Sequence, residues 1–275
     1  MSRGAMPAMR VGIVSRTATY WPLFVMARED ATLQLVELGS TAAGVDALLE
    51  CRVDVAATCP DVLITRNAPL GIAAGLVDRP PTTLVARRGI DAFEELRGCR
   101  VAVTQERGSV SVFLRALLRR HGLASNDYTQ IICGPTPAQA QALRRGAVDA
   151  AMLTSPFDDW LVAQGFVALA SVGDELGPCA FTTLNVRPHY SATPDWRAFI
   201  DRLVRTAELL GDAVTMRVLA EETGTRVRAP GPLRIDYDAR VDVAAVERLI
   251  GFVREDGIEV AAAAETCLDD GARTH

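Results

Sequence analysis

The amino-acid sequence predicts an α/β fold made of two similar lobes, each built around a largely parallel sheet. Three observations indicate this. The stretch GSTAAGVDALLECRVDVA at 39–56 returns as GPTPAQAQALRRGAVDAA at 134–151. Each copy lies within the same alternation of short apolar runs and helix-like segments, which is typical of parallel strands joined by crossover helices. The chain is 49% hydrophobic but only 5% aromatic, which favours a core of Ala, Val and Leu.

The two copies align with a shift of 95 residues. The matching pairs are Gly39/Gly134, Thr41/Thr136, Ala43/Ala138, Ala47/Ala142, Leu48/Leu143, Val53/Val148, Asp54/Asp149 and Ala56/Ala151. A period of this length that occurs only twice indicates a duplicated lobe and not a solenoid. Independent use of one β–α pattern is the alternative explanation.

The first half of the chain is expected to alternate buried strands with helices. Strands follow from short apolar runs, and Pro22 is tolerated in the first turn of a helix. The expected strands are 10–15, 33–38, 53–58, 72–77 and 82–87, and the expected helices are 21–30 and 42–50. DRPP at 78–81 separates the last two strands as a turn.

The same order then starts again, since RVAVTQ at 100–105 resembles RVGIVS at 10–15. Gly122 ends a predicted helix at 111–123. The other expected strands are 129–134, 148–153 and 181–186, and the other expected helices are 93–98, 194–211, 212–223 and 242–255. The alternation therefore places two lobes at roughly 8–85 and 88–180.

Composition narrows the classes of function. The net charge is −5, so the basic surface that nucleic acid requires is not expected. The chain has no run of 18 or more apolar residues, so no membrane span is expected. All 29 basic residues are arginine, which excludes chemistry that needs a lysine amine, such as a Schiff base with pyridoxal phosphate.

Histidine and cysteine give no sign of a metal or a cofactor. The three histidines and six cysteines lack metal-ligand spacings and a C-x-x-C pair, so no metal and no cofactor are expected. Buried thiols of a reducing compartment are expected instead.

The start MSRGAMPAMRVGIVS has no apolar signal region, and Cys51 comes too late for a lipoprotein anchor. We therefore expect a cytoplasmic protein from the residues given, and a periplasmic or extracellular one if the natural start lies upstream.

Ligand contacts are expected where strands end, because open α/β sheets bind ligands at the carboxyl ends of their strands. Gly39 and Gly134 permit tight exits from their strands. Ser40, Thr41 and Thr136 follow them, and each can cap its helix or face a ligand.

Two further strand exits match each other, at 58–61 and at 154–158. They place hydroxyls and a carboxylate toward the same cleft. The residues expected to contact a ligand from these exits are Thr58, Thr154 and Ser155.

The loops after the first strand of each lobe are expected to complete the cleft. Tyr20 and Trp21 are adjacent aromatic residues that suit the wall of a small-molecule cleft, although ordinary helix packing explains them equally well. The second loop, at 106–111, has the glycine, hydroxyls and helix start of an anion cradle, and Arg107 adds a positive charge. The residues expected there to contact a ligand are Arg107, Gly108, Ser109, Val110 and Ser111.

Five segments, taken in order over residues 10–190, resemble a known family. They are YWPLFVMARED, VELGSTAAGVDALLECRVDVAATCPD, IAAGLVDRPPTTLVAR, ELRGCRVAVTQERGSVSVFLRALLRRHGL and GPTPAQAQALRRGAVDAAMLTSPF. The resemblance is to type II periplasmic-binding-protein-like folds, in the nitrate, sulfonate, taurine and thiamine-pyrimidine-precursor branch of the solute-binding proteins of ABC transporters. The cysteine-rich run and the lysine of the pyrimidine-synthase branch are absent.

This resemblance implies a discontinuous architecture with a ligand cleft between two lobes that close on it. Lobe one would comprise 1–85 and 184–275, and lobe two 86–183. The hinge strands would lie near 82–87 and 181–186.

The function expected from these features is binding of a small organic anion or heterocycle, such as a sulfonate, a carboxylate or a pyrimidine-like compound, by a substrate-binding protein of the ABC-transporter type. An ABC permease would be the partner if the protein is exported. A regulatory ligand-binding domain is a third possibility, and it would need a separate partner because no DNA-binding segment is attached.

The alternative from another class is a cytosolic enzyme on the same fold, acting as a lyase, a decarboxylase or a cofactor-independent biosynthetic enzyme. Its candidate catalytic residues are Cys59 beside Asp61, or Asp158. The ordinary explanations are that Cys59 is a small buried residue and that Asp158 lies at a solvated helix start.

Overall fold

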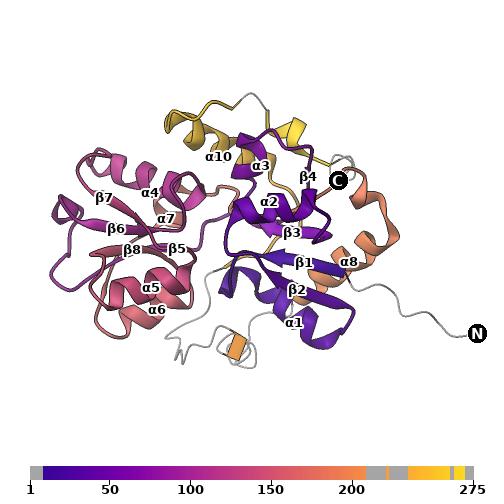
Figure 1. The fold of residues 1–275 in the computed structure, drawn as a ribbon, viewed down its shortest axis with the longest axis horizontal. Helices are drawn as coiled ribbons and strands as arrows, with labels where there is room; N and C mark the ends of the chain where they lie inside the picture. The colour runs from indigo at the N-terminus through magenta and orange to yellow at the C-terminus, as the bar shows by residue number, and fades with distance from the viewer. Residues whose placement is uncertain (1–8, 209–220, 223–234, 261–262, 270–275) are drawn as a thin grey trace, which may run out of the picture.

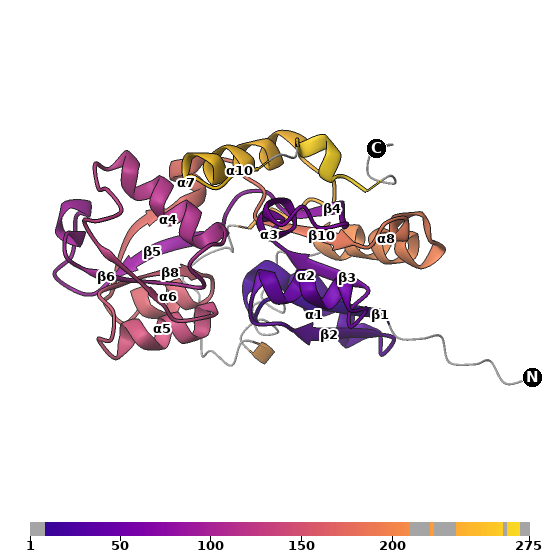
Figure 2. The same ribbon diagram turned by 45° about the horizontal axis from the view of Figure 1, so that its top comes forward.

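Two five-stranded sheets organise the residues that the computed structural model describes, namely 9–208, 221–222, 235–260 and 263–269. Helices cover each sheet, so that two α/β lobes stand side by side (Figure 1). Figure 2 shows the same lobes turned by 45°, with helix α10 (Val243–Glu255) lying across the top of both. The predicted two-lobed α/β fold is therefore confirmed.

The sheet of lobe one has the strand order β2-β1-β3-β10-β4. Strand β1 pairs in parallel with β2 and β3, whereas β10 runs antiparallel to both β3 and β4. The strands are β1 Met9–Ile13, β2 Leu33–Glu37, β3 Val55–Thr58, β4 Gly71–Val77 and β10 Thr182–Val186. The helices are η1 Ala18–Tyr20, α1 Trp21–Glu29, α2 Thr41–Leu49, α3 Asp61–Thr65, η3 Tyr190–Ala192, α8 Pro194–Glu208 and η4 Ala264–Cys267.

The sheet of lobe two has the strand order β7-β6-β8-β5-β9 and repeats the same pattern. Strand β6 is parallel to β7 and β8, and β5 is antiparallel to β8 and β9. The strands are β5 Thr82–Ala86, β6 Arg100–Val103, β7 Thr129–Ile132, β8 Ala150–Thr154 and β9 Val167–Ser171. The helices are η2 Phe93–Leu96, α4 Ser109–Arg120, α5 Thr136–Arg144, α6 Phe157–Val162 and α7 Val172–Leu176.

Both sheets are mixed, and the antiparallel strand occupies the same place in each. The chain passes from one sheet to the other at 78–81, between β4 and β5, and returns at 177–181, between α7 and β10. The assignment of a hinge to the neighbouring strands stays a prediction. Strand β9 and helix α7 have no counterpart among the sequence-based expectations, and most of the helix expected at 212–223 lies outside the described residues.

Helix α10 connects the two lobes by packing against helices of both. It packs against α4 of lobe two and against α3 of lobe one. Val246, Leu249 and Val253 belong to a hydrophobic cluster that includes residues of both lobes. Because these side chains are almost fully buried, the lobes share part of one core.

The aspartates of the repeated segment do the same structural work in both lobes. The carboxylate of Asp54 accepts the backbone N–H of Arg10 at 2.9 Å, and that of Asp149 accepts the backbone N–H of Arg100 at 2.9 Å. Each aspartate also pairs with the guanidinium of the same arginine. Each aspartate thus joins the start of one parallel strand, β1 or β6, to the segment that enters the neighbouring parallel strand, β3 or β8.

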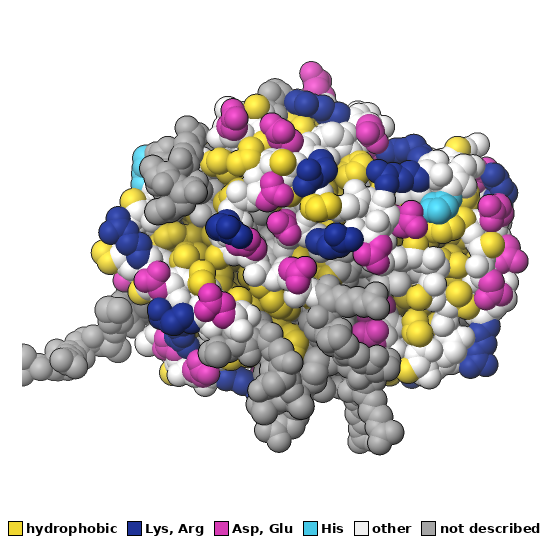
Figure 3. All heavy atoms as spheres, turned by 180° about the vertical axis from the view of Figure 1, so that it is seen from behind, with side chains coloured by type: hydrophobic (Ala, Val, Ile, Leu, Met, Phe, Trp, Pro, Cys, Tyr) yellow, Lys and Arg dark blue, Asp and Glu magenta, His cyan; other side chains and the backbone are white. Residues whose placement is uncertain are grey.

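No helix within the described ranges is long and apolar enough to cross a membrane. Figure 3 shows acidic and basic side chains interspersed over one face of the molecule and not separated by sign. Many arginines of the described residues pair with carboxylates, for example Arg66 with Asp46.

The substitution Asp149→Asn is expected to lower the free energy of unfolding by about 1–2 kcal/mol at pH 7, because hydrogen bonds to charged groups contribute about that much. The side-chain hydrogen bonds from Arg100 lower the pKa of Asp149 to about 2. This stabilisation is present above the ordinary pKa near 3.8 and is lost as the pH falls toward about 2. Urea unfolding of both proteins between pH 2 and 7 measures the difference.

The control is Asp46→Asn, which removes an exposed ion pair with Arg66 and should change the stability by about 0.5 kcal/mol or less. Equal losses in the two variants would contradict the role assigned to Asp149.

Candidate ligand-binding site

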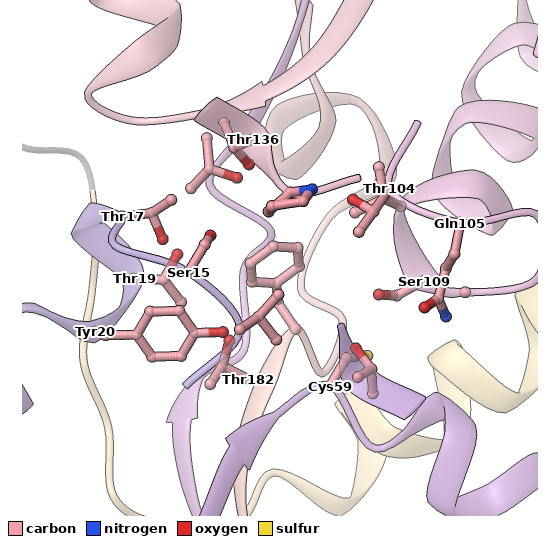
Figure 4. A pocket seen from close by; sticks show the side chains of 17 residues that line it. Ser15, Thr17, Thr19, Tyr20, Cys59, Thr104, Gln105, Ser109, Thr136 and Thr182 are labelled. Atoms are coloured by element: carbon pink, nitrogen blue, oxygen red, sulfur yellow. The ribbon is translucent and has the colours of Figure 1, made fainter. Parts of the chain in front are cut away.

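A pocket lies between the two sheets, at the carboxyl ends of their parallel strands (Figure 4). Its walls come from both lobes and from the segment that returns the chain to β10. Lobe one contributes Val14, Ser15, Thr17, Thr19, Tyr20, Thr41 and Cys59. Lobe two contributes Thr104, Gln105, Gly108, Ser109, Val110, Pro135, Thr136 and Thr154, the returning segment contributes Phe181, and the start of β10 contributes Thr182.

Hydroxyl groups dominate the polar surface of this pocket, and none of its lining side chains carries a formal charge. Burial raises the pKa of the Cys59 thiol and of the Tyr20 hydroxyl, so both groups stay neutral. Helices α2, α4 and α5 begin at lining residues, Thr41, Ser109 and Thr136, so the positive ends of three helix dipoles face the pocket. The pocket therefore offers neutral hydrogen-bonding groups with a weak preference for negative charge.

The loop after β1 supplies the wall of lobe one. Figure 4 shows Ser15, Thr17, Thr19 and Tyr20 on one side of the pocket, opposite Ser109 of lobe two. Thr19 is 1% exposed, and its hydroxyl has no hydrogen-bond partner in the described part of the chain. A buried hydroxyl without a partner costs free energy, and a ligand in this pocket would provide one.

A buried glutamine orients the wall of lobe two. The amide of Gln139 donates hydrogen bonds to the hydroxyl of Thr104 at 3.0 Å and to the carbonyl of Gly134 at 2.9 Å. These bonds join the loop after β6 to the loop after β7. The hydroxyl of Thr104 is thereby held at the pocket, where it can still donate its own hydrogen.

Two hydrogen bonds cross between the lobes beside the pocket, and each is the counterpart of the other. The backbone N–H of Ser109, at the start of α4, donates to the Asp61 carboxylate at 2.6 Å. The backbone N–H of Ala18, at the start of η1, donates to the carbonyl of Ser155 at 2.8 Å. In both cases the helix start that follows β1 or β6 in one lobe bonds to the segment that follows β8 or β3 in the other. We refer to these two bonds as the reciprocal contacts.

Asp61 is a buried carboxylate without a cationic partner in the contacts that the structure describes. It is 3% exposed, and its second oxygen, Oδ1, accepts no hydrogen bond. Burial raises the pKa of Asp61 to about 6 against the lowering effect of backbone hydrogen bonds, including that from Ser109. The carboxylate also contacts the Cys59 thiol, so it adjoins two residues of the pocket wall.

The structure brings many of the predicted contact residues to this pocket. Those that line it are Tyr20, Thr41, Gly108, Ser109, Val110, Thr136 and Thr154. Those that do not line it are Trp21, Ser40, Thr58, Arg107, Ser111 and Ser155. The assignment of ligand contacts to the lining residues stays a prediction.

Three of the remaining hydroxyls serve the protein's own structure. Ser40 accepts the N–H of Ala43 at 3.2 Å as the N-cap of α2. The hydroxyl of Thr58 accepts a hydrogen bond from Asn185 at 3.1 Å. Ser111 donates to the backbone carbonyl of Gln105 and so shapes the loop beside the pocket.

Trp21, Ser155 and Arg107 also lie away from the pocket lining. Trp21 is buried in the core of lobe one, and the hydroxyl of Ser155 donates to Asp159 at 3.2 Å. Arg107 borders a second hollow, beside the ion pair between Arg115 and Asp256. Arg107, the positive charge expected in an anion cradle, therefore lies at this second hollow and not at the pocket.

Several lining residues were not expected from the sequence. They are Val14, Ser15, Thr17, Thr19, Thr104, Gln105, Pro135, Phe181 and Thr182. A signal was present for some of them, because the loop SRTATYW is rich in hydroxyls and directly follows the first strand. Only its aromatic residues were singled out.

The candidate catalytic residues do not form an activated pair. Burial, followed by the neighbouring Asp61 charge, raises the pKa of Cys59, which is the opposite of what a thiolate nucleophile requires. Asp158 accepts a hydrogen bond from the Thr83 hydroxyl at 2.8 Å and does not line the pocket. Among the described residues, no three His, Cys, Asp or Glu side chains lie together as a metal site.

Comparison with known proteins gives one family match. A family model described as the NMT1-like family matches residues 7–220. No curated protein matches the chain.

Solved structures share the fold at low sequence identity. The alkanesulfonate-binding protein SsuA of Xanthomonas axonopodis pv. citri, bound to MOPS, has a TM-score of 0.76 at 20% identity, covering 96% of this chain and 99% of that one. The periplasmic aliphatic sulphonate-binding protein SsuA of Escherichia coli has a TM-score of 0.71 at 19% identity, covering 98% and 100%. The periplasmic nitrate-binding protein NrtA of Synechocystis PCC 6803 has a TM-score of 0.76 at 14% identity, covering 98% and 87%.

The buried carboxylate of Asp158 is expected to make the protein less stable as the pH rises. Burial, and then the neighbouring Asp159, raise the pKa of Asp158 to about 7. Its contribution to stability is fully present below the ordinary pKa near 3.8 and is lost as the pH rises through about 7. The variant Asp158→Asn should therefore gain roughly 1–3 kcal/mol relative to the wild type between pH 4 and 8, since one pKa unit corresponds to about 1.4 kcal/mol.

Chemical unfolding of wild type and variant at several pH values measures this difference. Asp46→Asn serves as the exposed control and should follow the wild type at every pH. A constant difference between wild type and Asp158→Asn across the range would contradict the prediction.

Proposed function

Because the chain belongs to the NMT1-like family, we propose that it is a solute-binding protein of the ABC-transporter type that holds a small organic anion or heterocycle between its lobes. The observation that supports this most is the pocket, because both lobes and the returning segment build its walls. Neutral hydroxyls and helix starts line it, which suits reversible recognition more than proton transfer.

The size of the pocket supports a ligand with few non-hydrogen atoms. The cavity volume is about 60 Å³. A site for a single buried water needs roughly 10–15 Å³ of occupied volume, so the pocket admits more than one group of that size. Nitrate, small carboxylates, small sulfonates and small ring compounds have few non-hydrogen atoms.

Ligand binding would favour closure through groups contributed by the two walls. Thr19 and Tyr20 belong to lobe one, whereas Ser109 and Thr136 belong to lobe two. A ligand that hydrogen-bonds to both sets binds the closed arrangement better than an open one, and this difference in affinity drives closure. A closed, loaded form is the state that an ABC permease would receive, so we propose a permease as the partner and the outer side of the membrane as the place of binding.

A small-molecule screen by thermal denaturation tests this function. The panel comprises nitrate, small carboxylates, small sulfonates and aminopyrimidines. At least one should raise the melting temperature in a dose-dependent way, because a ligand at 100 times its Kd adds about 2.7 kcal/mol to stability. The double variant Thr19→Val, Thr136→Val should lose most of this response, since it removes one hydroxyl from each wall.

Thr129→Val is the matched control, because Thr129 lies on the exposed strand β7 and outside the pocket. Its response should equal that of the wild type. A panel in which no compound raises the melting temperature of the wild type would overturn the proposed function.

A further inference from the structure

The two reciprocal contacts differ in the charge of their acceptors. The N–H of Ala18 is satisfied by a neutral backbone carbonyl, that of Ser155. The N–H of Ser109 is satisfied by a carboxylate, that of Asp61. A neutral acceptor is sufficient for the contact in one half of the molecule, so the contact alone does not require the charge in the other half.

The charge of Asp61 has no arginine partner among the described contacts, and it is stabilised only by neutral groups, namely backbone N–H groups at the starts of α3 and α4 and the Cys59 thiol. Its Oδ2 accepts the Ser109 N–H, and its Oδ1 has no hydrogen-bond partner among the described residues although Asp61 is 3% exposed. Burial of a carboxylate without a cation is costly, and such charges persist where they serve another purpose. The positive end of α4 offsets part of this cost.

Asp61 lies behind the pocket wall and not in its lining. Asp61 contacts Cys59 and Ser109, and both of these residues line the pocket. The lining itself carries no formal charge. The nearest arginine in the sequence of the facing loop, Arg107, borders the second hollow instead. Electrostatic interactions act strongly over short distances in surroundings of low dielectric constant, so a carboxylate without a cationic partner behind the wall biases what that wall accepts.

We infer that Asp61 determines the charge specificity of the pocket: it disfavours a ligand anion at the wall formed by Cys59 and Ser109, and favours an ammonium or other N–H group there. Where α2 and α5 begin, at Thr41 and Thr136, a ligand anion is favoured over an N–H group. The ligand would thus be a small dipolar molecule, with an acidic group toward these helix starts and an N–H donor toward Asp61. This inference rests on the proposed function and narrows its ligand class.

Matched pairs of small acids test the inference by isothermal titration calorimetry at pH 7.5. One pair is glycine and glycolate, which differ only in an ammonium or a hydroxyl group. The other pair is aminomethanesulfonate and methanesulfonate. The wild type should bind the ammonium-bearing member of at least one pair at least about tenfold more tightly, and Asp61→Asn should reduce this ratio to about threefold or less.

Asp61→Asn keeps the shape of the side chain and an oxygen that can accept the Ser109 N–H, so it removes the charge and leaves the contact. Asp61→Glu retains the charge and should restore a preference for the ammonium-bearing member. Asp61→Ser, which keeps a hydroxyl that can cap a helix, has the same expected result as Asp61→Asn and replaces it if that variant does not fold. Asp46→Asn removes an exposed carboxylate of lobe one and should leave the ratio unchanged.

The outcomes separate this inference from the proposed function. A ratio that is the same in wild type and Asp61→Asn would overturn the inference while the binding function stands. If the wild type bound a compound of the broader panel but none of the four probes, this would also overturn the inference while the binding function stands. No binding of any compound by the wild type would overturn both.

Discussion

The hydrogen bonds of Asn185 fix the pairing of strand β10 with β3, and through β10 the chain returns from lobe two to the sheet of lobe one. The amide of Asn185 donates to the carbonyls of Ala56 and Thr58 and to the Thr58 hydroxyl, at 3.1–3.3 Å. The hydroxyl of Thr183 donates to the same carbonyl of Thr58 and to Asn185. These polar groups are buried in a sheet that is otherwise apolar, so they specify one register and penalise the others. Since Phe181 and Thr182 directly precede this network, the register also sets where the returning segment meets the pocket.

Much of the fold could be predicted from the sequence because its signals are local. Apolar runs and helix starts recur in the same order in both halves, and that order is what defines each sheet. The Val-Asp ending of the repeat was informative for the same reason, since each aspartate bonds to the first strand of its own lobe. The return of the chain to β10 depends on pairing between segments more than a hundred residues apart, and it was predicted through family resemblance and not through periodicity.

The site was harder to predict, because a hydroxyl at a helix start serves the backbone or a ligand according to small differences in its direction. Ser40 and Thr41 are neighbours, yet Ser40 caps α2 while Thr41 lines the pocket. Arg107 lies in the expected loop, but its side chain borders a different hollow. Asp61 was considered only as a possible catalytic group, and its bond to the opposite lobe has no signature in the local sequence. The two lobes thus differ in which side chains face the pocket. The pattern of hydrophobic residues in the sequence does not contain this information.

The reciprocal contacts have a consequence for the origin of the two-lobed chain. Ala18 of lobe one bonds to Ser155 of lobe two, and Ser109 of lobe two bonds to Asp61 of lobe one. The two contacts join corresponding segments in opposite directions, as in a dimer with a two-fold axis, but they use different residues, because within the matched strand exits Ser155 aligns with Cys59 and not with Asp61. The contact between the lobes therefore has only an approximate two-fold form. In a single chain, each side of such an interface can mutate without its twin, and an ancestral symmetric cavity can become selective for a ligand whose two ends differ.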